Sequence, residues 1–377
     1  MSGAADVVVI GGGLMGLWSA LAAARAGRSV ALLEAESIGR HASSASAGGV
    51  RSLNRHPAEI PLARAALPLW DRAAGDLGAD VGFQRSGQIR VAEDEAALAE
   101  LEARRAATAA LGYTHEELIG ANELRAMEPA LAAHCRGALV VRDDGFADPL
   151  KTVHALKRAC RSTGVAIHEG VRVAHVTRGA PLTLETSAGS WRGDVVVNAA
   201  GTWGGAIAEG VGEPVPIAPA ALQMSVIAPV PAFVSSVIGT AGRKLSLKQG
   251  SGGHVVIGGG FRGTVDERAR IGRPLPALVG ANLNNAVRLF PCLATARVVR
   301  TWAGIEGMTA DGLPVLSPSR TTAGLVHAFG FSAHGFALSP LIGRLVLAII
   351  EGKDPGLPIE PFSIDRFRPA MEGRRHA

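Results

Sequence analysis

The chain has 377 residues, of which 47% are hydrophobic and 19% charged, and its formal net charge is +5. This composition excludes a disordered protein, and the length allows one large or two medium domains around a sizeable core. The positive charges are spread as single Arg residues, so nucleic acid is not an expected partner. Cys135, Cys160 and Cys292 form no CxxC pair, so we expect no disulfide framework, no metal site and a reducing, cytoplasmic setting.

No segment of the sequence resembles a signal peptide or a membrane span. The first apolar run, residues 7–10, is too short and continues into glycines. Residues 341–350 are also apolar, but they cover only half of a membrane span and include Arg344. We therefore expect a buried helix near the C-terminus and no membrane span.

The first element predicted along the chain is a strand that ends in a glycine turn. Residues 7–10 (VVVI) form a continuous β-branched run, which is typical of a central parallel strand covered on both faces. Gly11, Gly13 and Gly16 follow with the spacing GxGxxG. This spacing supplies a tight turn, a close backbone approach to a pyrophosphate, and tight packing of a helix on a strand.

A helix and a second strand complete this unit. Residues 14–26 are rich in Ala and Leu and favour a helix, and Gly27 is placed to end it. A second strand, residues 30–33, leads to Glu34, whose carboxylate can accept hydrogen bonds from ribose hydroxyls. A glycine turn without a ligand has no use for Glu34, so the unit predicts dinucleotide binding. Glu34 disfavours NADP, while FAD and NAD both remain open.

Later segments favour FAD over NAD. Residues 37–51 are mostly small, which suits a backbone that lies against a flat ligand, although a flexible loop is the alternative. A buried strand, residues 195–197, leads into residues 198–203 (NAAGTW). Residues 324–330 and 331–338 again have the order strand, glycine turn and helix start. A second helix N-terminus of this kind would stabilise the negative charge of a reduced flavin.

With these segments the chain resembles the D-amino-acid oxidase/glycine oxidase/sarcosine oxidase family of FAD-dependent oxidoreductases. Four blocks in the family's order support the resemblance over nearly the whole chain: the N-terminal glycines, residues 43–51, residues 198–203, and the stretch from Trp302 through Asp311 and Gly312 to Leu338. Residues 56–63 and Lys248 with Gln249 make the chain most similar to members like the sarcosine oxidase β-subunit.

The resemblance implies an α/β fold of the glutathione-reductase-like FAD type. A Rossmann-like FAD-binding domain (residues 1–80, 146–222 and 300–377) would interleave with a substrate domain (81–145 and 223–299) built on a mixed or antiparallel sheet. The sequence agrees coarsely with this division. Residues 93–110 are predicted to form an exposed amphipathic helix outside any βαβ repeat, and residues 224–227 and 254–257 are predicted to be antiparallel strands.

The resemblance also implies the residues that hold a noncovalent FAD. Val173, in the strand-like residues 171–176, matches the position whose backbone holds the adenine, and residues 331–337 would surround the pyrimidine side of the flavin. The implied contacts are Gly11, Gly13, Leu14, Met15, Gly16, Glu34, Ala35, Ala42, Ser43, Ala47, Gly48, Gly49, Val173, Gly201, Gly330, Phe331, Ser332, Ala333, His334, Gly335, Phe336 and Ala337.

The sequence departs from the family where relatives bind substrate. Glu306 stands where many amino-acid-oxidising members have an Arg for the substrate carboxylate. Ala333 and Ala337 replace an Arg of glycine oxidases and a Lys of sarcosine oxidases. The Lys that assists oxygen reduction has no match, which hints at a dehydrogenase that passes electrons onward. Gly304 lies near the place of the Cys that carries covalent flavin, so only another residue, such as His41, is left for a covalent link.

Five residues are candidates for the substrate pocket. If Glu306 faces the flavin, the substrate is expected to carry a cationic group, because an unpaired buried carboxylate is costly; otherwise it is a surface or salt-bridged residue. A bound carboxylate then needs Arg51 or Lys248, although Arg51 could form an inter-domain salt bridge and Lys248 could lie at a solvated strand edge. His334, in the predicted flavin loop, and His41 are the remaining candidates, each with a structural role as the alternative.

The resemblance implies an enzyme that oxidises the C–N bond of a small amine or amino acid: an N-substituted glycine, an opine or a D-amino acid. A hydride would pass from the α-carbon to flavin N5, the imine would hydrolyse, and O2 or another acceptor would reoxidise the flavin. The alternatives are an FAD-dependent 2-hydroxy-acid dehydrogenase and a non-catalytic flavin-holding subunit that works with partner subunits. An NAD-binding regulatory protein is a further alternative from another class.

Overall fold

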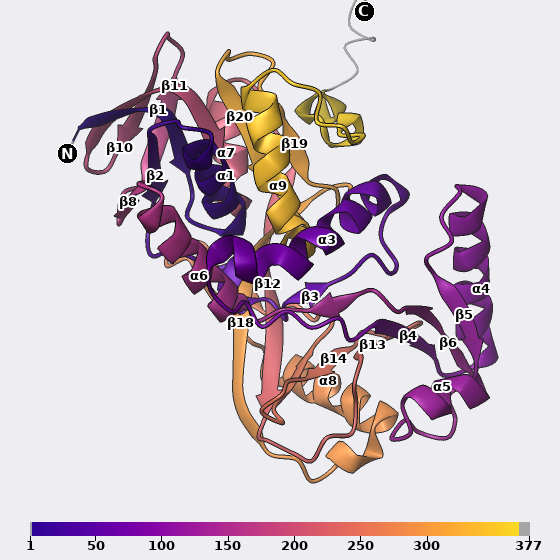
Figure 1. The fold of residues 1–377 in the computed structure, drawn as a ribbon. Helices are drawn as coiled ribbons and strands as arrows, with labels where there is room; N and C mark the ends of the chain where they lie inside the picture. The colour runs from indigo at the N-terminus through magenta and orange to yellow at the C-terminus, as the bar shows by residue number, and fades with distance from the viewer. Residues whose placement is uncertain (1, 369–377) are drawn as a thin grey trace, which may run out of the picture.

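The computed structural model describes residues 2–368, which are organised around two large β-sheets (Figure 1). One sheet has eight strands and the other has ten, and β3 (Gly49–Val50) pairs with β7 (Gly145–Phe146) in a small third sheet. No helix within residues 2–368 is long and apolar enough to cross a membrane.

The eight-stranded sheet has a parallel centre in the order β20-β11-β1-β2-β8. Antiparallel β19 borders β20, and β10 and β9 extend the sheet beside the first half of β11. The strands are β1 (Gly3–Ile10), β2 (Val30–Glu34), β8 (Ala166–Glu169), β9 (Val173–Thr177), β10 (Leu182–Thr186), β11 (Gly189–Asn198), β19 (Val315–Pro318) and β20 (Leu325–Phe329). The strand expected at residues 171–176 thus begins two residues later than predicted.

Both faces of this sheet are buried, which explains the continuous apolar run in β1. Val7 and Val9 pack into one core cluster with four helices, whereas Val8 and Ile10 point to the opposite face and pack with Ile207 of α7 (Gly204–Gly210). The four helices of the first face are α1 (Leu14–Arg25), α3 (Ile60–Leu77), α6 (Pro149–Ser162) and α9 (Gly335–Ile350).

Two of these helices start close together. The helix predicted after the glycine turn is α1, and the buried helix predicted near the C-terminus is the second half of α9; both predictions are confirmed. α1 follows β1, α9 follows β20, and the two helices pack against each other (Figure 1). Because β1 and β20 belong to the same parallel set, both helices begin at the C-terminal edge of the sheet, where ligands of such folds bind.

The ten-stranded sheet is antiparallel except where β13 pairs with β4. Its order is β16-β17-β18-β12-β15-β14-β13-β4-β6-β5. The strands are β4 (Gln88–Ala92), β5 (Glu117–Gly120), β6 (Gly137–Val141), β12 (Ile217–Ile227), β13 (Val237–Thr240), β14 (Ser246–Gln249), β15 (Val255–Gly258), β16 (Thr264–Asp266), β17 (Ile271–Arg273) and β18 (Val298–Thr309). The predicted antiparallel strands are confirmed, since Ser225 pairs with Ile257.

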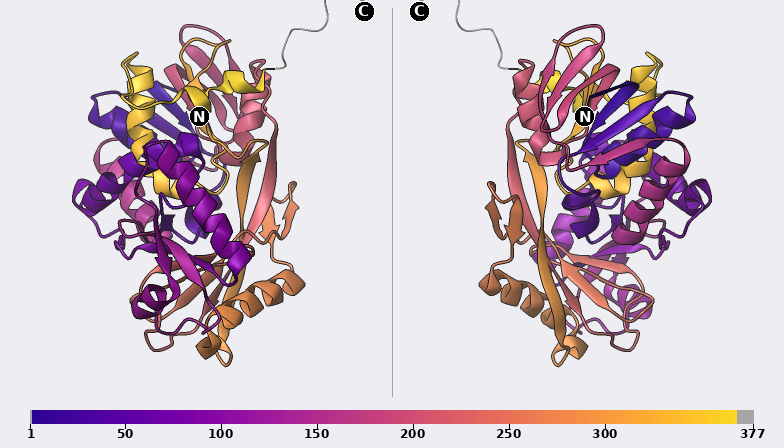
Figure 2. Two further views of the ribbon diagram at one scale, coloured as in Figure 1. Left: turned by 90° about the vertical axis from the view of Figure 1, so that its right-hand side faces the viewer. Right: turned by 90° about the vertical axis from the view of Figure 1, so that its left-hand side faces the viewer.

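The long strands β12 and β18 connect the two halves of the molecule. They pair along almost their whole length, from Ile217 opposite Thr309 to Ile227 opposite Val298. Figure 2 shows them running side by side from the eight-stranded sheet into the ten-stranded sheet. The domain boundaries proposed at 222/223 and 299/300 therefore fall inside continuous strands.

Helices cover the outer parts of the ten-stranded sheet. The helix predicted at residues 93–110 is confirmed as α4 (Glu95–Ala110), and its N-cap residue Asp94 accepts a hydrogen bond from Ala97 N (2.8 Å). The remaining helices are α2 (Ala42–Ala45), α5 (Ala121–Met127) and α8 (Pro276–Leu289), with 3₁₀ turns at Pro57–Glu59, Gly201–Trp203, Pro291–Leu293, Glu360–Phe362 and Ile364–Phe367.

Candidate active site: two adjoining cavities

A cavity opens at the C-terminal edge of the parallel strands, and we call it the dinucleotide cavity. Its walls come from the β1–α1 turn, the end of β2, residues 199–203 after β11, and the β20–α9 loop. Gly13 caps α1 without a side-chain hydrogen bond, so the N–H groups that begin this helix lie at the cavity wall. A helix N-terminus of this kind is a ready site for a phosphate group.

Gly16 allows α1 to begin this close to β1. A Cβ atom added at Gly16 would lie 1.9 Å from the carbonyl oxygen of Gly11, which is far inside van der Waals contact. Gly16 itself does not line the cavity. Its role is therefore to pack the helix on the strand and so to place the phosphate-binding turn.

Glu34 is fixed at the cavity wall by two backbone N–H groups. Its Oε2 accepts from Gly12 N (2.7 Å) and its Oε1 from Glu36 N (2.8 Å). Each carboxylate oxygen keeps a free lone pair that can accept from a ribose hydroxyl. Burial raises the pKa of Glu34, and the two N–H groups oppose this shift.

The β20–α9 loop at the other end of the cavity contains strained backbone. Ser332 (φ 47°) and Ala333 (φ 68°) both adopt the left-handed conformation, which is uncommon for residues other than glycine. Ser332 Oγ accepts from Thr309 N (3.1 Å), and Ala333 N donates to Glu306 Oε2 (3.0 Å). These contacts with β18 hold the loop in its unfavourable shape beside the cavity.

Most of the predicted cofactor contacts line this cavity. They are Gly11, Gly13, Leu14, Met15, Glu34, Ala35, Ala42, Ser43, Val173, Gly201, Gly330, Phe331, Ala333, Gly335 and Phe336. Ala47, Gly48 and Gly49 line a neighbouring cavity instead. The segment around them is ordered into α2 and β3 rather than being a flexible loop.

Three predicted contacts in the β20–α9 region point elsewhere. The hydroxyl of Ser332 turns to Thr309 (Oγ to Oγ1, 3.0 Å), and Ala337 is buried at 2% exposure inside α9. The ring of His334 binds Glu59, with Nδ1 2.8 Å from Oε2, and lines neither cavity. Burial lowers the pKa of His334 to about 4, so its ring is neutral at pH 7. His334 thus contacts Glu59 at the start of α9 and lies near Arg51 and Arg55, and its place in the substrate pocket stays a prediction.

Arg270 lines the dinucleotide cavity and was missed in the sequence. It lies in the turn between β16 and β17, its guanidinium carbon is 4.5 Å from the ring centroid of Trp203, and its Nη1 is 3.9 Å from Glu36 Oε1. Arg172 also lines this cavity. With Arg40, three arginine side chains line this cavity, which suits an anionic dinucleotide, but a short turn far along the chain has no sequence signal for such a contact.

A second cavity of about 440 Å³ lies beside the first, and we call it the cationic cavity. Five basic side chains line it, and Glu306 is the one acidic residue among the described residues of its wall; the basic residues are Arg51, Arg55, Arg90, Arg243 and Lys244. The two cavities share the lining residues Ala42, Ser46, Glu306, Ala333 and Phe336. A ligand of the cationic cavity therefore meets the end of the dinucleotide cavity formed by the β20–α9 loop.

Glu306 lies on β18 where the two cavities meet. No cation within residues 2–368 forms an ion pair with it, and its carboxylate accepts a hydrogen bond from Ala333 N. Burial raises the pKa of Glu306 to about 7, although the Ala333 N–H opposes the shift. Glu306 therefore forms no salt bridge among the described residues and lies half-buried at the walls of both cavities, and near neutral pH its carboxyl group can take up or release a proton.

Arg51 and Arg55 bring two positive charges into the cationic cavity. Arg55 is only 2% exposed, its Nε donates to Arg51 O (3.1 Å), and its Nη1 is buried without a hydrogen-bond partner among the described residues. Burial, together with the charge of Arg55, lowers the pKa of Arg51 to about 9, and burial also lowers the pKa of Arg55. The charges of Glu59 and Asp144 act on both groups and favour their charged form, but neither carboxylate forms an ion pair with them, so an anion in the cavity can still bind this pair.

Two further candidates lie outside the cationic cavity. Lys248 is 8% exposed, donates to Ala147 O (3.2 Å) and lies 4.1 Å from the ring centroid of Phe146, so it is corrected from a carboxylate ligand to a buried structural residue. His41 lines the dinucleotide cavity, with its ring 4.7 Å from that of Trp203. Its place is thus corrected from the substrate pocket to the cofactor region.

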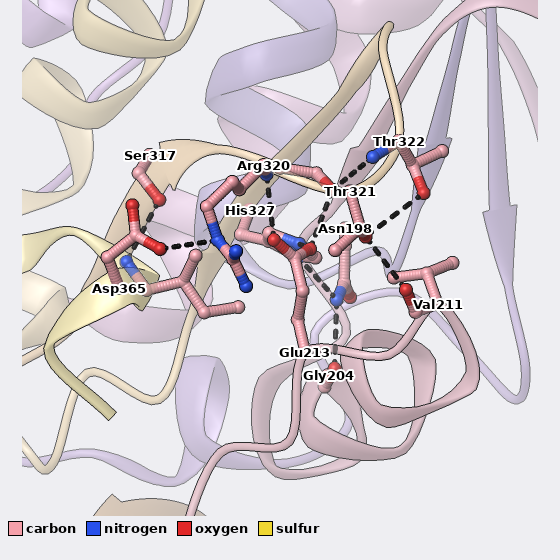
Figure 3. A network of polar contacts seen from close by, with 12 residues as sticks. Asn198, Gly204, Val211, Glu213, Ser317, Arg320, Thr321, Thr322, His327 and Asp365 are labelled. Carbon is pink, nitrogen blue, oxygen red and sulfur yellow. Dashed lines mark hydrogen bonds and ion pairs between the residues drawn. The ribbon is translucent and has the colours of Figure 1, made fainter. Parts of the chain in front are cut away.

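A buried polar network supports residues 199–203 from behind (Figure 3). Asn198, at the end of β11, donates from Nδ2 to Gly204 O (2.9 Å) and to His327 Nδ1 (3.2 Å). His327 Nε2 lies 3.1 Å from Glu213 Oε2, so the tautomer that satisfies both contacts carries its proton on Nε2. Glu213 also accepts from Ser319 Oγ (2.6 Å).

Replacing Glu213 with Gln is expected to lower the free energy of unfolding by about 3 kcal/mol, because an amide cannot accept from all the donors that face the carboxylate. Burial alone raises the pKa of Glu213, but the hydrogen bonds from His327, Ser319 and Arg320 N lower it to about 2. A folded-state pKa below the unfolded value of 4.5 stabilises the protein above pH 4.5, and this contribution is lost as the pH falls towards 2.

Thermal unfolding from pH 7 down to pH 3 measures this effect. The difference in free energy of unfolding between the parent protein and Glu213→Gln should become smaller below pH 4.5. Glu209→Gln, an exposed position on α7, is the matched control and should change little. An equal loss of stability in both variants would contradict the role of Glu213.

The fold and the two joined cavities define a dinucleotide-binding α/β oxidoreductase. The chain belongs to the DAO family, described as FAD dependent oxidoreductase, whose profile matches residues 6–349. It is 30% identical over 372 residues to the glycine oxidase of Geobacillus kaustophilus (strain HTA426), covering 96% of this chain and 97% of that protein. The sarcosine oxidase subunit beta of Rhizobium meliloti (strain 1021) is 26% identical over 371 residues, covering 96% and 88%.

A solved structure agrees with this assignment. The crystal structure of the Geobacillus kaustophilus glycine oxidase matches with a TM-score of 0.88 at 26% identity, covering 99% of this chain and 100% of that one. The predicted fold class, the family resemblance and the FAD cofactor are thus confirmed. The protein is an FAD-dependent oxidoreductase enzyme.

Proposed function

We propose that this enzyme oxidises the C–N bond of a small amine or amino acid. One observation carries the proposal: one cavity is lined by Glu306, which has no ion-pair partner among the described residues, and by Arg51 and Arg55, which feel the charges of Glu59 and Asp144 but form no ion pair with either. An amino acid or N-substituted glycine supplies both complementary groups, an ammonium and a carboxylate. The names of two relatives, glycine oxidase and sarcosine oxidase subunit beta, support the same substrate class.

The residues of the dinucleotide cavity fit a noncovalent FAD. The α1 N-terminus would hold its pyrophosphate, Glu34 its ribose, and the β20–α9 loop its flavin ring, next to Glu306. When bound, FAD supplies the acceptor for the hydride that leaves the substrate carbon. The cationic cavity must then fix the substrate at the boundary marked by Glu306, Ala333 and Phe336.

The protein side chains supply binding, orientation and proton transfer. Arg51 and Arg55 bind the substrate carboxylate and so orient the α-carbon. Glu306, whose pKa is raised to about 7, accepts a proton from the substrate ammonium and leaves a neutral amine with a free electron pair. Once the α-carbon has given up its hydride, water adds to the imine and releases a carbonyl compound and an amine or ammonia.

An anaerobic substrate screen tests this proposal. The FAD-loaded enzyme is mixed with D-amino acids, N-substituted glycines, opines and 2-hydroxy acids while flavin absorbance is followed. We expect an amine to bleach the flavin and to release ammonia or a primary amine in equal amount. Bleaching by 2-hydroxy acids alone would show a hydroxy-acid dehydrogenase, and a flavin reduced by dithionite but by no amine would indicate a flavin-holding subunit. Admitting air afterwards shows whether O2 is the acceptor.

A further inference from the structure

The cationic cavity holds more positive charge than one carboxylate can balance. Five basic groups and one acidic group of the described residues line it. Arg51 and Arg55 lie towards the β20–α9 loop, because their charges act on His334 of that loop. Arg90, Arg243 and Lys244 come from strand β4 and from the turn after β13 in the ten-stranded sheet, whereas Arg51 and Arg55 follow β3. We call the first three residues the distal cluster.

The distal cluster lies on or just after two neighbouring strands of the ten-stranded sheet. Arg90 lies in the middle of β4, opposite Gly239 of β13, and is close enough for its charge to lower the pKa of Arg51. Arg243 and Lys244 lie in the turn that follows β13. The wall of the cationic cavity thus includes basic groups from both strands beside Arg51.

Arg243 is held in place while one of its nitrogens remains free. Its Nε forms an ion pair with Glu93, and its Nη1 donates to Asn285 O (2.8 Å). Its Nη2 is buried and has no hydrogen-bond partner among residues 2–368. Because Glu93 also pairs with Arg288 (3.3 Å) and His134 (2.7 Å), this one carboxylate does not cancel the positive charge around it.

Arg90, like Arg243, has one guanidinium nitrogen with an acidic partner and another without a hydrogen-bond partner. Its Nη2 is 3.4 Å from Glu100 Oε1, whereas its Nε is buried without a partner among the described residues. Arg90 and Arg243 both line the cavity, and each has one buried donor without a partner among the described residues. Because an unsatisfied buried donor costs free energy, a small turn of either guanidinium group towards a ligand with acceptor oxygens would relieve this cost. Lys244 adds a third positive charge at the same wall.

We propose that the distal cluster is a second anion-binding subsite and that the substrate is an amine with two carboxylates. This inference rests on the proposed function. Arg51 and Arg55 bind the carboxylate beside the reacting carbon, and Arg243 with Arg90 and Lys244 binds the second carboxylate. An acidic amino acid and an N-carboxyalkyl amino acid share this chemistry.

Binding of ligands that cannot be oxidised tests the subsite without turnover. Thiodiacetate and (methylthio)acetate differ by one carboxylate, and neither contains an amine. Titration of the FAD-loaded enzyme, followed by calorimetry and by the flavin spectrum, should show that thiodiacetate binds about 30-fold more tightly, as expected for charge-assisted hydrogen bonds to one additional carboxylate. Equal dissociation constants for the two acids would overturn the proposal.

A matched pair of variants assigns the effect to Arg243. Arg243→Gln and Arg288→Gln each remove one partner of Glu93, but only Arg243 lines the cavity. Arg243→Gln should remove most of the preference for thiodiacetate, and Arg288→Gln should keep it. Lys244→Gln, at an exposed position where misfolding is not expected, should reduce the preference by a smaller factor. A preference retained in Arg243→Gln and in Lys244→Gln would overturn the distal cluster as its cause.

Turnover separates this inference from the proposed function. D-glutamate and D-aspartate test an acidic amino acid, and iminodiacetate and N-(1-carboxyethyl)alanine test an N-carboxyalkyl amine. Oxidation of only monocarboxylic amines, such as sarcosine, would overturn the dicarboxylate inference and leave the C–N oxidation intact. Tight thiodiacetate binding without oxidation of any amine would support the subsite and contradict the proposed function.

Discussion

A Glu306→Gln enzyme is expected to have a kcat/KM about a thousand-fold below that of the parent enzyme. In the proposed mechanism this carboxylate pairs with the substrate ammonium and takes up its proton, and losing such a group typically costs two to four orders of magnitude. The Gln side chain can still accept the hydrogen bond from Ala333 N, which Glu306 accepts at 3.0 Å. The substitution therefore removes the charge and preserves the contact with the β20–α9 loop.

The pH dependence of this pair of enzymes gives a second readout. Because the pKa of Glu306 is raised to about 7, kcat/KM of the parent enzyme should rise with pH through this value as the carboxylate forms. The Glu306→Gln profile should lack this step. Steady-state kinetics from pH 5.5 to 9 measures both, and an unchanged profile with near-normal kcat/KM would contradict the role of Glu306 as the proton acceptor.

The stability of the ligand-free protein should fall as the pH rises through about 7, whereas kcat/KM should rise. A folded-state pKa above the unfolded value of 4.5 means that the folded protein favours the protonated carboxyl, so this stabilisation is complete below pH 4.5 and is lost as the pH rises through about 7. Glu306→Gln removes this dependence and should be the more stable protein at pH 8. Glu306→Leu also loses the bond to Ala333 N and should in addition bind FAD less tightly.

Gly16→Ala is expected to weaken FAD binding at least a hundred-fold and to give a colourless protein on purification. The added Cβ would lie 1.9 Å from Gly11 O, so α1 must move away from β1 and carry its N-terminal N–H groups out of position. Those N–H groups are the proposed contacts of the pyrophosphate. Fluorescence titration of the apoprotein with FAD measures the change in affinity.

Gly75→Ala is the matched control for this substitution. Gly75 lies inside α3 with no heavy atom within 4 Å of an added Cβ, so Ala should be accommodated and should stabilise the helix by about 0.5–1 kcal/mol. Circular dichroism verifies that Gly16→Ala is folded before its FAD affinity is compared. Parental FAD affinity in a folded Gly16→Ala protein would contradict the assigned role of Gly16.

The sequence by itself determined the features that depend on local physics. The apolar run in β1, the glycine spacing and Glu34 predicted the dinucleotide unit, because strand burial, turn geometry and helix starts are fixed by neighbouring residues. Neighbouring residues likewise predicted the glycine turn between β20 and α9 and the positions of the helices α4 and α9. Most of the cofactor contacts that the family resemblance implies line one cavity, the dinucleotide cavity.

Only the tertiary structure decided what the charged side chains do. Lys248 and His334 were predicted near the substrate, and the structure shows that Lys248 donates to Ala147 and that His334 binds Glu59, each from a distant part of the chain. Arg270 reaches the dinucleotide cavity through a turn of the other sheet, and Arg243 reaches the cationic cavity from the turn after β13.

The physical reason is the range of the forces involved. A charge acquires its role from burial and from partners that may lie a hundred or more residues away, as Glu306 does from its place between two cavities and Arg243 does from Glu93. Periodicity and spacing report only on near neighbours in the chain. The sequence therefore predicted the glycine turn and strand ends that line the dinucleotide cavity, whereas the packing of the two sheets against each other determined which charges line the cationic cavity.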